Sequence, residues 1–455
     1  MIGIVESRAD IASTTIGEAL RAQTEWETII DDTRPSDAGG GRVYRHDSFE
    51  LRQFDSLHLR LENVATVFSS TPEFIIFLSR HSGETGPLLT AHFTGNFGNA
   101  DYGGDPRSFA PACPNVQRVV FKTLQDAAPE EYDVGIECTH HGPTRIDVPS
   151  LFVELGSSEA EWTDTDGASA VATAVLKLSS TPPMRERQLI GFGGGHYAPR
   201  FERILTRTDW AVGHIGADWC LDALGNPRAN QDVLGRAIKC SDANYALVTG
   251  THPTLKRTLE DMSIRVVGER WLTASTGVDL SVIEALEAQL CPISDGLRLG
   301  ERIDSWPPAR PETDISPELE IETLSKELLD EVVGIDRETA RGAINANTLA
   351  FTTEQGGSVP ARAIAVESAT AVNSIRSEFI DILRHKYETV ESDGEIITAT
   401  RDVFDPDAAS TVGVPEGPAF GKLAAGESVE IDGTQIDPAV VHRSETVSFH
   451  VQSGS

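Results

Sequence analysis

The chain has 455 residues, which is long enough for two or three domains and a large hydrophobic core. Acidic residues outnumber basic ones by 70 to 38, and the net charge of −32 is spread along the whole chain. This pattern favours a surface adapted to very high salt over an acidic tail. It excludes capture of a polyanion by long-range attraction at ordinary salt. At molar salt, where the Debye length is about 3 Å, short-range contacts with nucleic acid remain available.

The five cysteines are widely spaced and form no Cys-x-x-Cys pair, which indicates reduced thiols rather than a disulfide framework. The first residues, MIGIVESRAD, lack the charged start and long apolar run of a secretion signal. No other apolar stretch is long enough to cross a bilayer. We therefore expect a soluble cytoplasmic protein that does not associate with membranes.

Strand-like and helix-like segments alternate along the first 267 residues, beginning with a strand at 2–5 and a helix at 9–25. The next strands are predicted at 56–62, 74–78, 88–90, 132–138 and 150–155. A helix begins near Ser157 or Ser158, continues through 172–178 and ends at Pro182. Strands at 188–192, 210–213 and 245–250 and a helix at 255–262 complete the series. The alternation predicts an α/β fold with a mostly parallel, doubly wound sheet and helices on both faces.

The character of the chain changes after Val267. Residues 305–314 are proline-rich and polar, as in a linker, and amphipathic helices are predicted at 316–334 and 377–390. The tail at 413–441 combines many turn residues with short β-like runs. We therefore expect a main domain over 1–300 and a C-terminal α+β extension over 315–455.

Six of the twelve histidines lie between residues 81 and 214, and nearly all of them follow an apolar, strand-like run. In an open α/β sheet, ligands bind in the crevice outside the carboxyl ends of the parallel strands. Because one edge of the sheet collects these ends, we expect His81, His92, His140, His141 and His196 to line a single site. The sixth histidine of this region is His214.

Glu137, His140 and His141 lie at the end of one predicted strand and in the turn after it. A carboxylate and imidazoles at this spacing are able to bind Zn²⁺. Alternatively, Glu137 and one histidine form a pair that activates water, or the histidines only cap backbone groups in the turn. We predict a metal set of Glu137, His140, His141 and His196, with the same residues and His81 and His92 as the catalytic group.

Two further segments are candidates for substrate binding. Gly193-Gly194-Gly195 precedes His196 and Tyr197; it fails as a dinucleotide motif, but its N–H groups could hold an oxyanion or a phosphate. Thr94 and Asn96 offer a hydroxyl and an amide to a polar substrate. For both segments the alternative is a tight turn. A serine hydrolase is not expected, since there is no Gly-x-Ser-x-Gly sequence, and Cys138 is interpreted as a packing residue.

Seven motifs occur in the order found in a known family, and the chain resembles the archaeal and plant type of D-aminoacyl-tRNA deacylase over about residues 1–267. The motifs are SRHS (79–82), HFTGN (92–96), YGG (102–104), THHGPT (139–144), PSLFVELGSSEAEW (149–162), GGGHYAP (193–199) and GHI (213–215). The resemblance implies hydrolysis of the ester that joins a D-amino acid to tRNA, zinc dependence, and a fold like the nucleoside-phosphorylase and peptidyl-tRNA-hydrolase group. It does not fix which histidines bind zinc.

The implied partner is tRNA, and we expect a monomer without an obligate protein partner. In the extension, GVPEGPAFGKL (413–423) resembles a segment of the tRNase Z family. The extension either assists tRNA capture, with Lys422 near a phosphate, or is a stabilising appendage. Two rival functions stay open: a phosphorylase or nucleosidase on the same fold, and a non-catalytic protein that binds the 3′ end of tRNA. The preferred D-amino acids and the number of metal ions are also open.

Overall fold

A computed structural model describes residues 1–306 and 319–450 of the chain. The chain divides into two compact units, Met1–Thr276 and Gly277–Ser455. This division precedes the boundary predicted at 300–315, because β13 (Arg298–Leu299) pairs with β15 (Ala350–Glu354) of the second unit. Most of the predicted linker at 305–314 lies outside the described residues.

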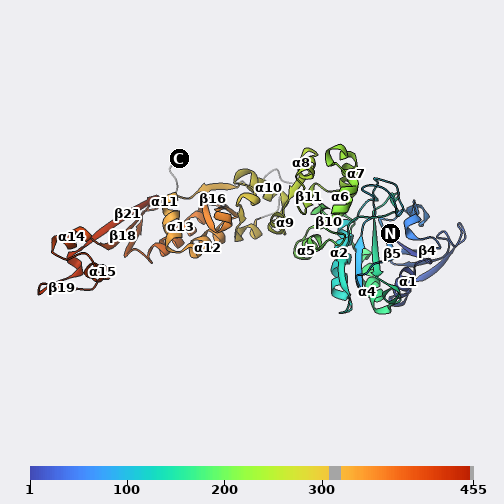
Figure 1. Cartoon of the computed structure of the whole chain (residues 1–455), viewed down its shortest axis with the longest axis horizontal. Coiled ribbons are helices and arrows are strands. Elements are labelled where there is room, and N and C mark those ends of the chain that lie inside the picture. The colour runs from blue at the N-terminus through green and yellow to red at the C-terminus, as the bar shows by residue number, and fades with distance from the viewer. Residues whose placement is uncertain (307–318, 451–455) are drawn as a thin grey trace. The chain divides into compact units, whose positions relative to one another are not determined.

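The first unit contains an eight-stranded sheet in the order β2-β3-β4-β1-β5-β8-β6-β7 (Figure 1). The strands β4, β1, β5 and β8 run parallel to one another, and β2 and β3 add an antiparallel edge. The strands β6 and β7 are parallel to each other, but β6 is antiparallel to β8. The bounds are β1 (Ile2–Ser7), β2 (Glu27–Asp31), β3 (Gly41–His46), β4 (Phe49–Phe54), β5 (Phe74–Arg80), β6 (Leu88–His92), β7 (Asp133–Ile136) and β8 (Ser150–Gly156).

Three helices, α1 (Ile11–Gln23), α2 (Pro114–Ala127) and α4 (Thr165–Leu176), cover one face of this sheet. Asp10 and Asp164 cap α1 and α4 by accepting hydrogen bonds from backbone N–H groups of the first turn. The opposite face packs against loop residues such as Phe68 and Ile146. The expectation of helices on both faces is therefore wrong for this sheet, and its second face is free to carry a site.

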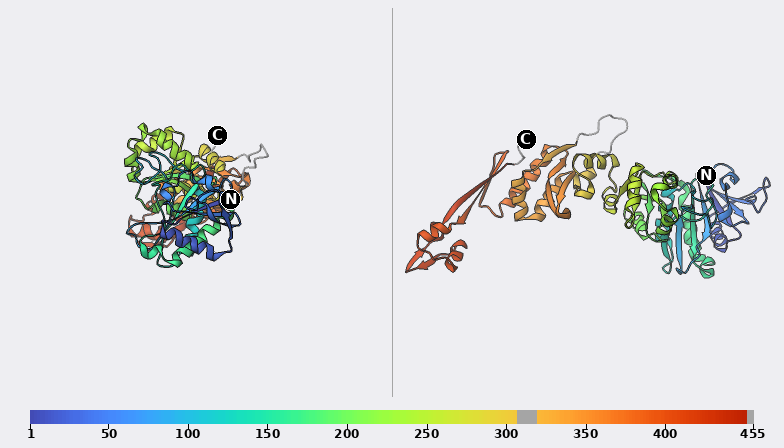
Figure 2. Two further views of the ribbon diagram at one scale, coloured as in Figure 1. Left: turned by 90° about the vertical axis from the view of Figure 1, so that its right-hand side faces the viewer. Right: turned by 45° about the horizontal axis from the view of Figure 1, so that its top comes forward.

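A second, fully parallel sheet in the order β10-β9-β11-β12 completes the first unit (Figure 2). Its strands are β9 (Gln188–Phe192), β10 (Ala211–Gly216), β11 (Tyr245–Val248) and β12 (Arg265–Val267), and the helices around it are α5 (Pro199–Arg207), α6 (Asp218–Leu224), α7 (Gln231–Ser241), α8 (Pro253–Asp261) and α9 (Glu269–Ala274). The short helix α3 (Glu159–Trp162) begins at Ser158 with a capping box, as predicted. The fold is thus a mixed α/β fold with mostly parallel strand pairs.

Two segments of the first unit differ from prediction. The antiparallel strands β2, β3 and β4 were not indicated by the sequence pattern. The strand predicted at 56–62 is wrong, and the segment forms a 3-10 turn at His58–Arg60. His58 is buried there, 3.3 Å from Ser13 Oγ and edge-on to the rings of Phe77 and Phe152, so the apparent β alternation reflects this burial rather than strand pairing.

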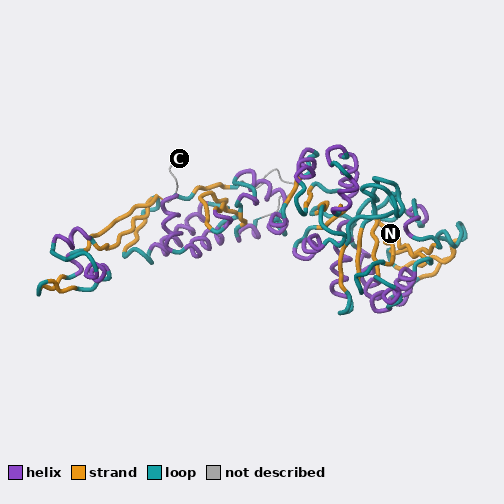
Figure 3. Tube along the Cα trace, viewed as in Figure 1, coloured by secondary structure: helices purple, strands orange, loops and turns teal. Residues whose placement is uncertain are grey.

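The second unit combines α10 (Leu280–Gln289) with a four-stranded antiparallel sheet, β13-β15-β16-β14, and a helical layer (Figure 3). The predicted helix at 316–334 is half wrong, because residues 320–323 pair with β16 as a strand. The helix predicted at 377–390 ends at Leu383, and its last residues form β17. The bounds are β14 (Glu320–Thr323), α11 (Lys326–Ile335), α12 (Arg337–Asn347), β16 (Val359–Val366), α13 (Ala369–Leu383) and β17 (Thr389–Ser392).

A long hairpin of β18 (Ile396–Phe404) and β21 (His442–His450) carries the insertion 405–441 between its strands. The insertion contains α14 (Pro406–Thr411), α15 (Pro418–Ala424) and a hairpin of β19 (Val429–Ile431) and β20 (Thr434–Ile436), which confirms the short β runs predicted there. Lys422 is exposed on α15, and it is the only basic residue in the insertion against seven acidic ones. In the described chain, no helix has the length and apolarity needed to cross a membrane.

We predict that the chain ending at Thr276 folds without the second unit. The two large cores of the first unit consist of residues 2–178, whereas Leu324–Phe449 form a separate core. A shortened chain should unfold cooperatively in high salt, as followed by circular dichroism, with a midpoint within a few degrees of the first transition of the full chain. A shortened chain that stays unfolded would contradict this independence.

Candidate active site

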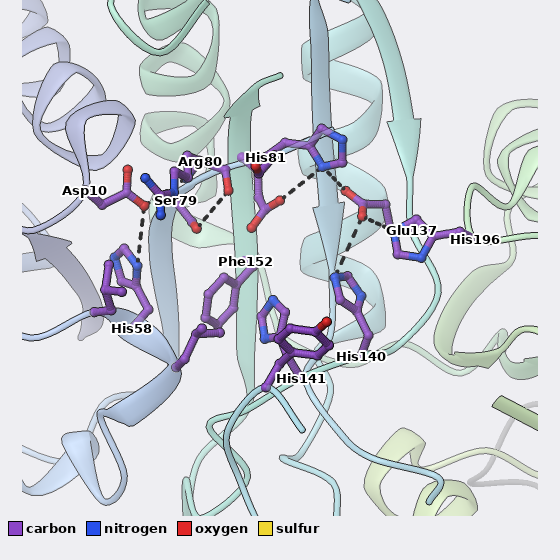
Figure 4. Close-up of a pocket in the computed structure, with 15 residues that line it drawn as sticks. Asp10, His58, Ser79, Arg80, His81, Glu137, His140, His141, Phe152 and His196 are labelled. Atoms are coloured by element: carbon purple, nitrogen blue, oxygen red, sulfur yellow. Dashed lines mark hydrogen bonds and ion pairs between the residues drawn. The ribbon is translucent and has the colours of Figure 1, made fainter. Parts of the chain in front are cut away.

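The five histidines predicted to share a site come together around one cavity of about 490 Å³. His81, His140, His141 and His196 line the cavity (Figure 4), and the buried ring of His92 lies 4.2 Å from that of His140 between centroids. The sixth, His214, is a buried support. Its ring lies 3.0 Å from Thr139 Oγ1 and 2.9 Å from the Ala110 carbonyl, which steadies the strand end before His140.

The reason for this convergence differs from the predicted one. His81 follows β5, whereas His92 is the last residue of β6 and Glu137 follows β7, and both of these strands run in the opposite direction. Their side chains meet over the loop-covered face of the sheet, where Phe152 and Glu154 of β8 lie. The cavity is therefore on a face of a mixed sheet and not outside one edge of a parallel sheet.

Glu137 is the hub of the cluster and is only 2% exposed. Its Oε2 lies 2.6 Å from His196 Nε2 and 3.9 Å from His140 Nε2, and its Oε1 lies 3.1 Å from His81 Nδ1. Burial raises the pKa of Glu137, but the hydrogen bonds from His196 and His81 lower it more strongly. Glu137 is therefore a buried carboxylate that the surrounding histidines keep ionised.

Glu154 is a second buried carboxylate in the cavity, and it was not among the predicted site residues. It lies 3.6 Å from His81 Nδ1 and 3.4 Å from His92 Nε2. Burial raises the pKa of Glu154, but these histidines bring it down to about 2. The sequence feature that could have identified Glu154 is its place as a lone glutamate in the apolar strand SLFVEL. Its neighbours Val153 and Leu155 face the helix-covered core.

The negative charge of the carboxylates raises the pKa values of His81 and His196. Burial lowers the pKa of His81, but contacts with Glu137 and Glu154 outweigh it and raise the pKa to about 9. Contacts with the Cys138 thiol and with Glu137 raise the pKa of His196 to about 10. Cys138 Sγ lies 3.5 Å from His196 Nδ1, so this residue belongs to the cluster and is more than a packing residue.

Three histidines present a free ring nitrogen to the cluster. His140 Nδ1 lies 2.8 Å from the Cys138 carbonyl, His141 Nδ1 lies 2.6 Å from the Gly142 carbonyl, and His92 Nδ1 lies 3.2 Å from the Phe93 carbonyl. Because a carbonyl only accepts, each Nδ1 carries a proton, and each Nε2 is the nitrogen turned toward the cluster, as in metal-binding histidines. His92 Nε2 is buried without a hydrogen-bond partner among the described residues.

Metal-ligand atoms lie within 4.8 Å of one another in three overlapping groups. They are His92, His140 and His141; Cys138, His140 and His196; and His81, Glu137 and Glu154. The imidazole, thiolate and carboxylate donors and the unpartnered His92 Nε2 fit Zn²⁺. Every member of the predicted metal set belongs to at least one group, His140 belongs to two, and no group contains all four of them.

The other predicted substrate residues lie around the cavity rather than in it. Tyr197 contacts the cluster, because its hydroxyl lies 3.1 Å from His81 Nε2. The Thr94 hydroxyl donates to the Pro143 carbonyl at 2.7 Å, and the Asn96 amide donates to the Gly103 carbonyl at 3.0 Å. Both side chains brace the loops beside the histidines.

The glycine run does not line the cavity. The N–H of Gly193 donates to the Gly216 carbonyl at 2.8 Å, and Gly193 and Gly194 have positive φ angles of 82° and 87°. A Cβ on Gly193 would clash with the Thr249 carbonyl. Gly193, Gly194 and Gly195 therefore form a tight turn that leads to His196, in line with the alternative interpretation of this segment.

The cavity also has a second polar region that the sequence pattern did not indicate. Asp10, His58 and Arg80 line it on the far side of Phe152 from the histidine cluster (Figure 4). Asp10 Oδ2 accepts from the Arg80 backbone N–H at 3.1 Å and lies 3.8 Å from His58 Nδ1. Burial lowers the pKa of His58 to about 4, so its ring is neutral. The second polar region thus contains a neutral imidazole, unlike the carboxylate–histidine cluster.

The fold and this cluster define a mixed α/β protein with a buried carboxylate–histidine centre in an open cavity. Residues 68–267 match the family model described as D-aminoacyl-tRNA deacylase. Proteins named D-aminoacyl-tRNA deacylase from Haloquadratum walsbyi and Haloarcula marismortui are 46% and 47% identical, over 100% and 96% of this chain and 96% and 97% of theirs. One from Methanoregula boonei is 31% identical over 99% of this chain and 98% of its own. The chain belongs to the D-aminoacyl-tRNA deacylase family, which confirms the resemblance seen in the sequence.

A solved structure matches part of this chain. The crystal structure of a conserved protein of unknown function, AF0625, is 28% identical with a TM-score of 0.55, and the match covers 61% of this chain and 98% of that one. Nearly the whole of that protein thus corresponds to part of this chain, and the remainder of this chain has no counterpart in it.

Proposed function

We propose that this chain hydrolyses the ester bond between a D-amino acid and the 3′ end of tRNA, which releases the free amino acid and tRNA. Membership of the family supports the substrate, and the family match at 68–267 includes the histidine cluster. The observation that carries the chemistry is Glu137, a buried carboxylate that His81 and His196 keep ionised at the wall of a 490 Å³ cavity. Such a carboxylate is placed to accept a proton from an attacking water.

The residues around Glu137 have distinct roles in this proposal. His196 is the most exposed ring of the cluster, with 35% of its side chain accessible, and its pKa is raised, so it is placed to donate a proton to the leaving ribose oxygen. The protonated His81 supplies positive charge beside the tetrahedral intermediate, and Tyr197 holds its ring through Nε2. Substrate chirality would be read by which side-chain direction the cavity wall excludes.

We also propose that the site uses Zn²⁺. His92, His140 and His141 would hold the ion through their Nε2 atoms, with Glu137 and His196 at its edge, and their Nδ1–carbonyl contacts would fix the ring orientations. When bound, zinc supplies a Lewis acid that lowers the pKa of water and polarises the ester carbonyl. Number and occupancy of the ions are questions for metal analysis.

The rival functions are less well supported. A phosphorylase would need the glycine run as a phosphate loop, but this run does not line the cavity and the Gly193 N–H is already bonded. A non-catalytic tRNA-binding protein would have no use for two ionised carboxylates in a substrate-sized cavity. Likeness to the nucleoside-phosphorylase and peptidyl-tRNA-hydrolase group, a cytoplasmic location and a monomeric state stay predictions. Haloarchaeal relatives and the net charge of −32 support a halophilic protein.

The function is tested with matched D- and L-tyrosyl-tRNA in molar KCl, by release of labelled amino acid. We expect the D-ester to be cleaved at least about tenfold faster than the L-ester, a discrimination of ~1.4 kcal/mol or more. Glu137→Gln, which keeps size and removes the charge, should abolish turnover. Equal rates on both esters, or release from neither, would contradict the proposal.

The chain ending at Thr276 tests the role of the extension. If the extension assists tRNA capture, the shortened chain should need a higher tRNA concentration for half-saturation than the full chain. If the extension is only a stabilising appendage, the kinetics of the two chains should be the same.

Metal dependence is tested by dialysis against a chelator, followed by metal analysis and addition of zinc. We expect turnover to be lost on dialysis and restored by zinc, and His140→Ala should lower the zinc content as well as the rate. The zinc content gives a readout that does not depend on activity. Full activity in protein shown to be metal-free would leave Glu137 with a histidine as an unassisted general base.

A further inference from the structure

All Phe, Trp and Tyr side chains that are more than about a third exposed in the described residues belong to the candidate active site or to a cavity whose lining residues adjoin it in the chain. Tyr102 is 75% exposed and lines the main cavity. Tyr197 contacts His81, and Trp219 is 48% exposed. Scattered exposed apolar residues need no explanation, but the gathering of every exposed aromatic ring at one place indicates a binding surface.

Trp219 belongs to a second cavity of about 260 Å³. Its lining adds polar groups from the 95–107 loop, including Asn99 and Arg107. Gly98 lets this loop approach α6, because a Cβ there would lie 2.8 Å from that of Ala223. The second cavity therefore joins an indole ring to hydrogen-bonding groups and to one side chain of each charge, Arg107 and Asp101.

The two cavities lie on either side of one stretch of backbone. Thr139 lines the second cavity, and the next residue, His140, lines the first. Likewise, Asp101 lines the second cavity and Tyr102 lines the first. The Gly142 N–H donates to the Tyr102 carbonyl at 3.2 Å, which joins the two loops. A ligand that occupies the main cavity therefore has to pass only this backbone to reach Trp219.

Stacking suits this chain better than charge attraction. A net charge of −32 gives no long-range attraction for tRNA, and contacts to phosphates weaken steeply as salt rises. A base stacked on an aromatic ring contributes about 1–3 kcal/mol and is recognised whatever its identity, because every base has a π face. Unpaired nucleotides offer such faces, whereas the bases of a duplex are covered.

We propose that Trp219 and Tyr102 form a stacking platform for the unpaired 3′-terminal nucleotides of tRNA. A base occupies the second cavity against Trp219, with Arg107 and Asn99 at its edge, while the aminoacyl group occupies the main cavity. The platform rests on the proposed function for its ligand, and it assigns the recognition of a single-stranded end to residues outside the carboxylate–histidine cluster.

The test measures binding without turnover. Anisotropy of the labelled single-stranded tetranucleotide ACCA is titrated in molar KCl with the full chain and with Trp219→Ala, Tyr102→Ala and Trp219→Phe. Each alanine variant should weaken binding about 5- to 100-fold, the equivalent of one lost stack, and Trp219→Phe should stay within about threefold of the parent. Ile30→Ala, which removes an equally exposed apolar side chain on β2, is the matched control and should bind as the parent does.

The outcome separates this proposal from the proposed function. If D-aminoacyl-tRNA is not cleaved but ACCA binds through Trp219, the function fails and the platform stands. Unchanged ACCA binding in both alanine variants overturns the platform, as does equal binding of a blunt RNA duplex. If sedimentation shows that the parent forms a dimer that Trp219→Ala dissociates without any effect on ACCA, the surface belongs to a second copy of the chain and the platform is likewise overturned.

Discussion

The whole site depends on keeping two carboxylates ionised inside the protein. Glu137 and Glu154 are 2% and 4% exposed, and an isolated buried carboxylate costs several kcal/mol. His196 and His81 offset this by hydrogen bonds and positive charge, and His92 does so for Glu154. The dependence is mutual, because removing one partner leaves the other buried and unpaired. This explains why imidazoles from distant parts of the chain are held at fixed positions in one cavity.

The change of strand direction in the large sheet makes this arrangement possible. If every strand were parallel, the ends of β5 and β7 would lie at one edge and project outward. Because β6 and β7 are reversed relative to β8, His81 and Glu137 approach from opposite ends and meet above Glu154. The helices α1, α2 and α4 cover the other face, so the apolar core and the charged site occupy opposite sides of the same strands.

The sequence pattern predicted most strands and the clustering of histidines, because apolar runs followed by polar turns are local signals. It could not predict the direction of β6, which depends on pairing with β8 and not on its own residues. The same limit explains the misplaced strand at 56–62, where His58 is buried by Asp10 and Ser13. Glu154 could have been predicted as a site residue, because a glutamate in a buried strand needs a charged or hydrogen-bonding partner. The exposed ring of Trp219 carries no periodic signal, and only the fold places it beside the site.

Buried carboxylates hold His81 and His196 protonated, and histidine NMR tests this most directly. In metal-free protein, the ring signals of His81 and His196 should titrate with midpoints near 9 and 10. In Glu137→Gln both midpoints should fall, because removing the negative charge disfavours the protonated ring. Midpoints near the ordinary value of about 6.5 in the parent protein, or midpoints unmoved by the substitution, would contradict the account.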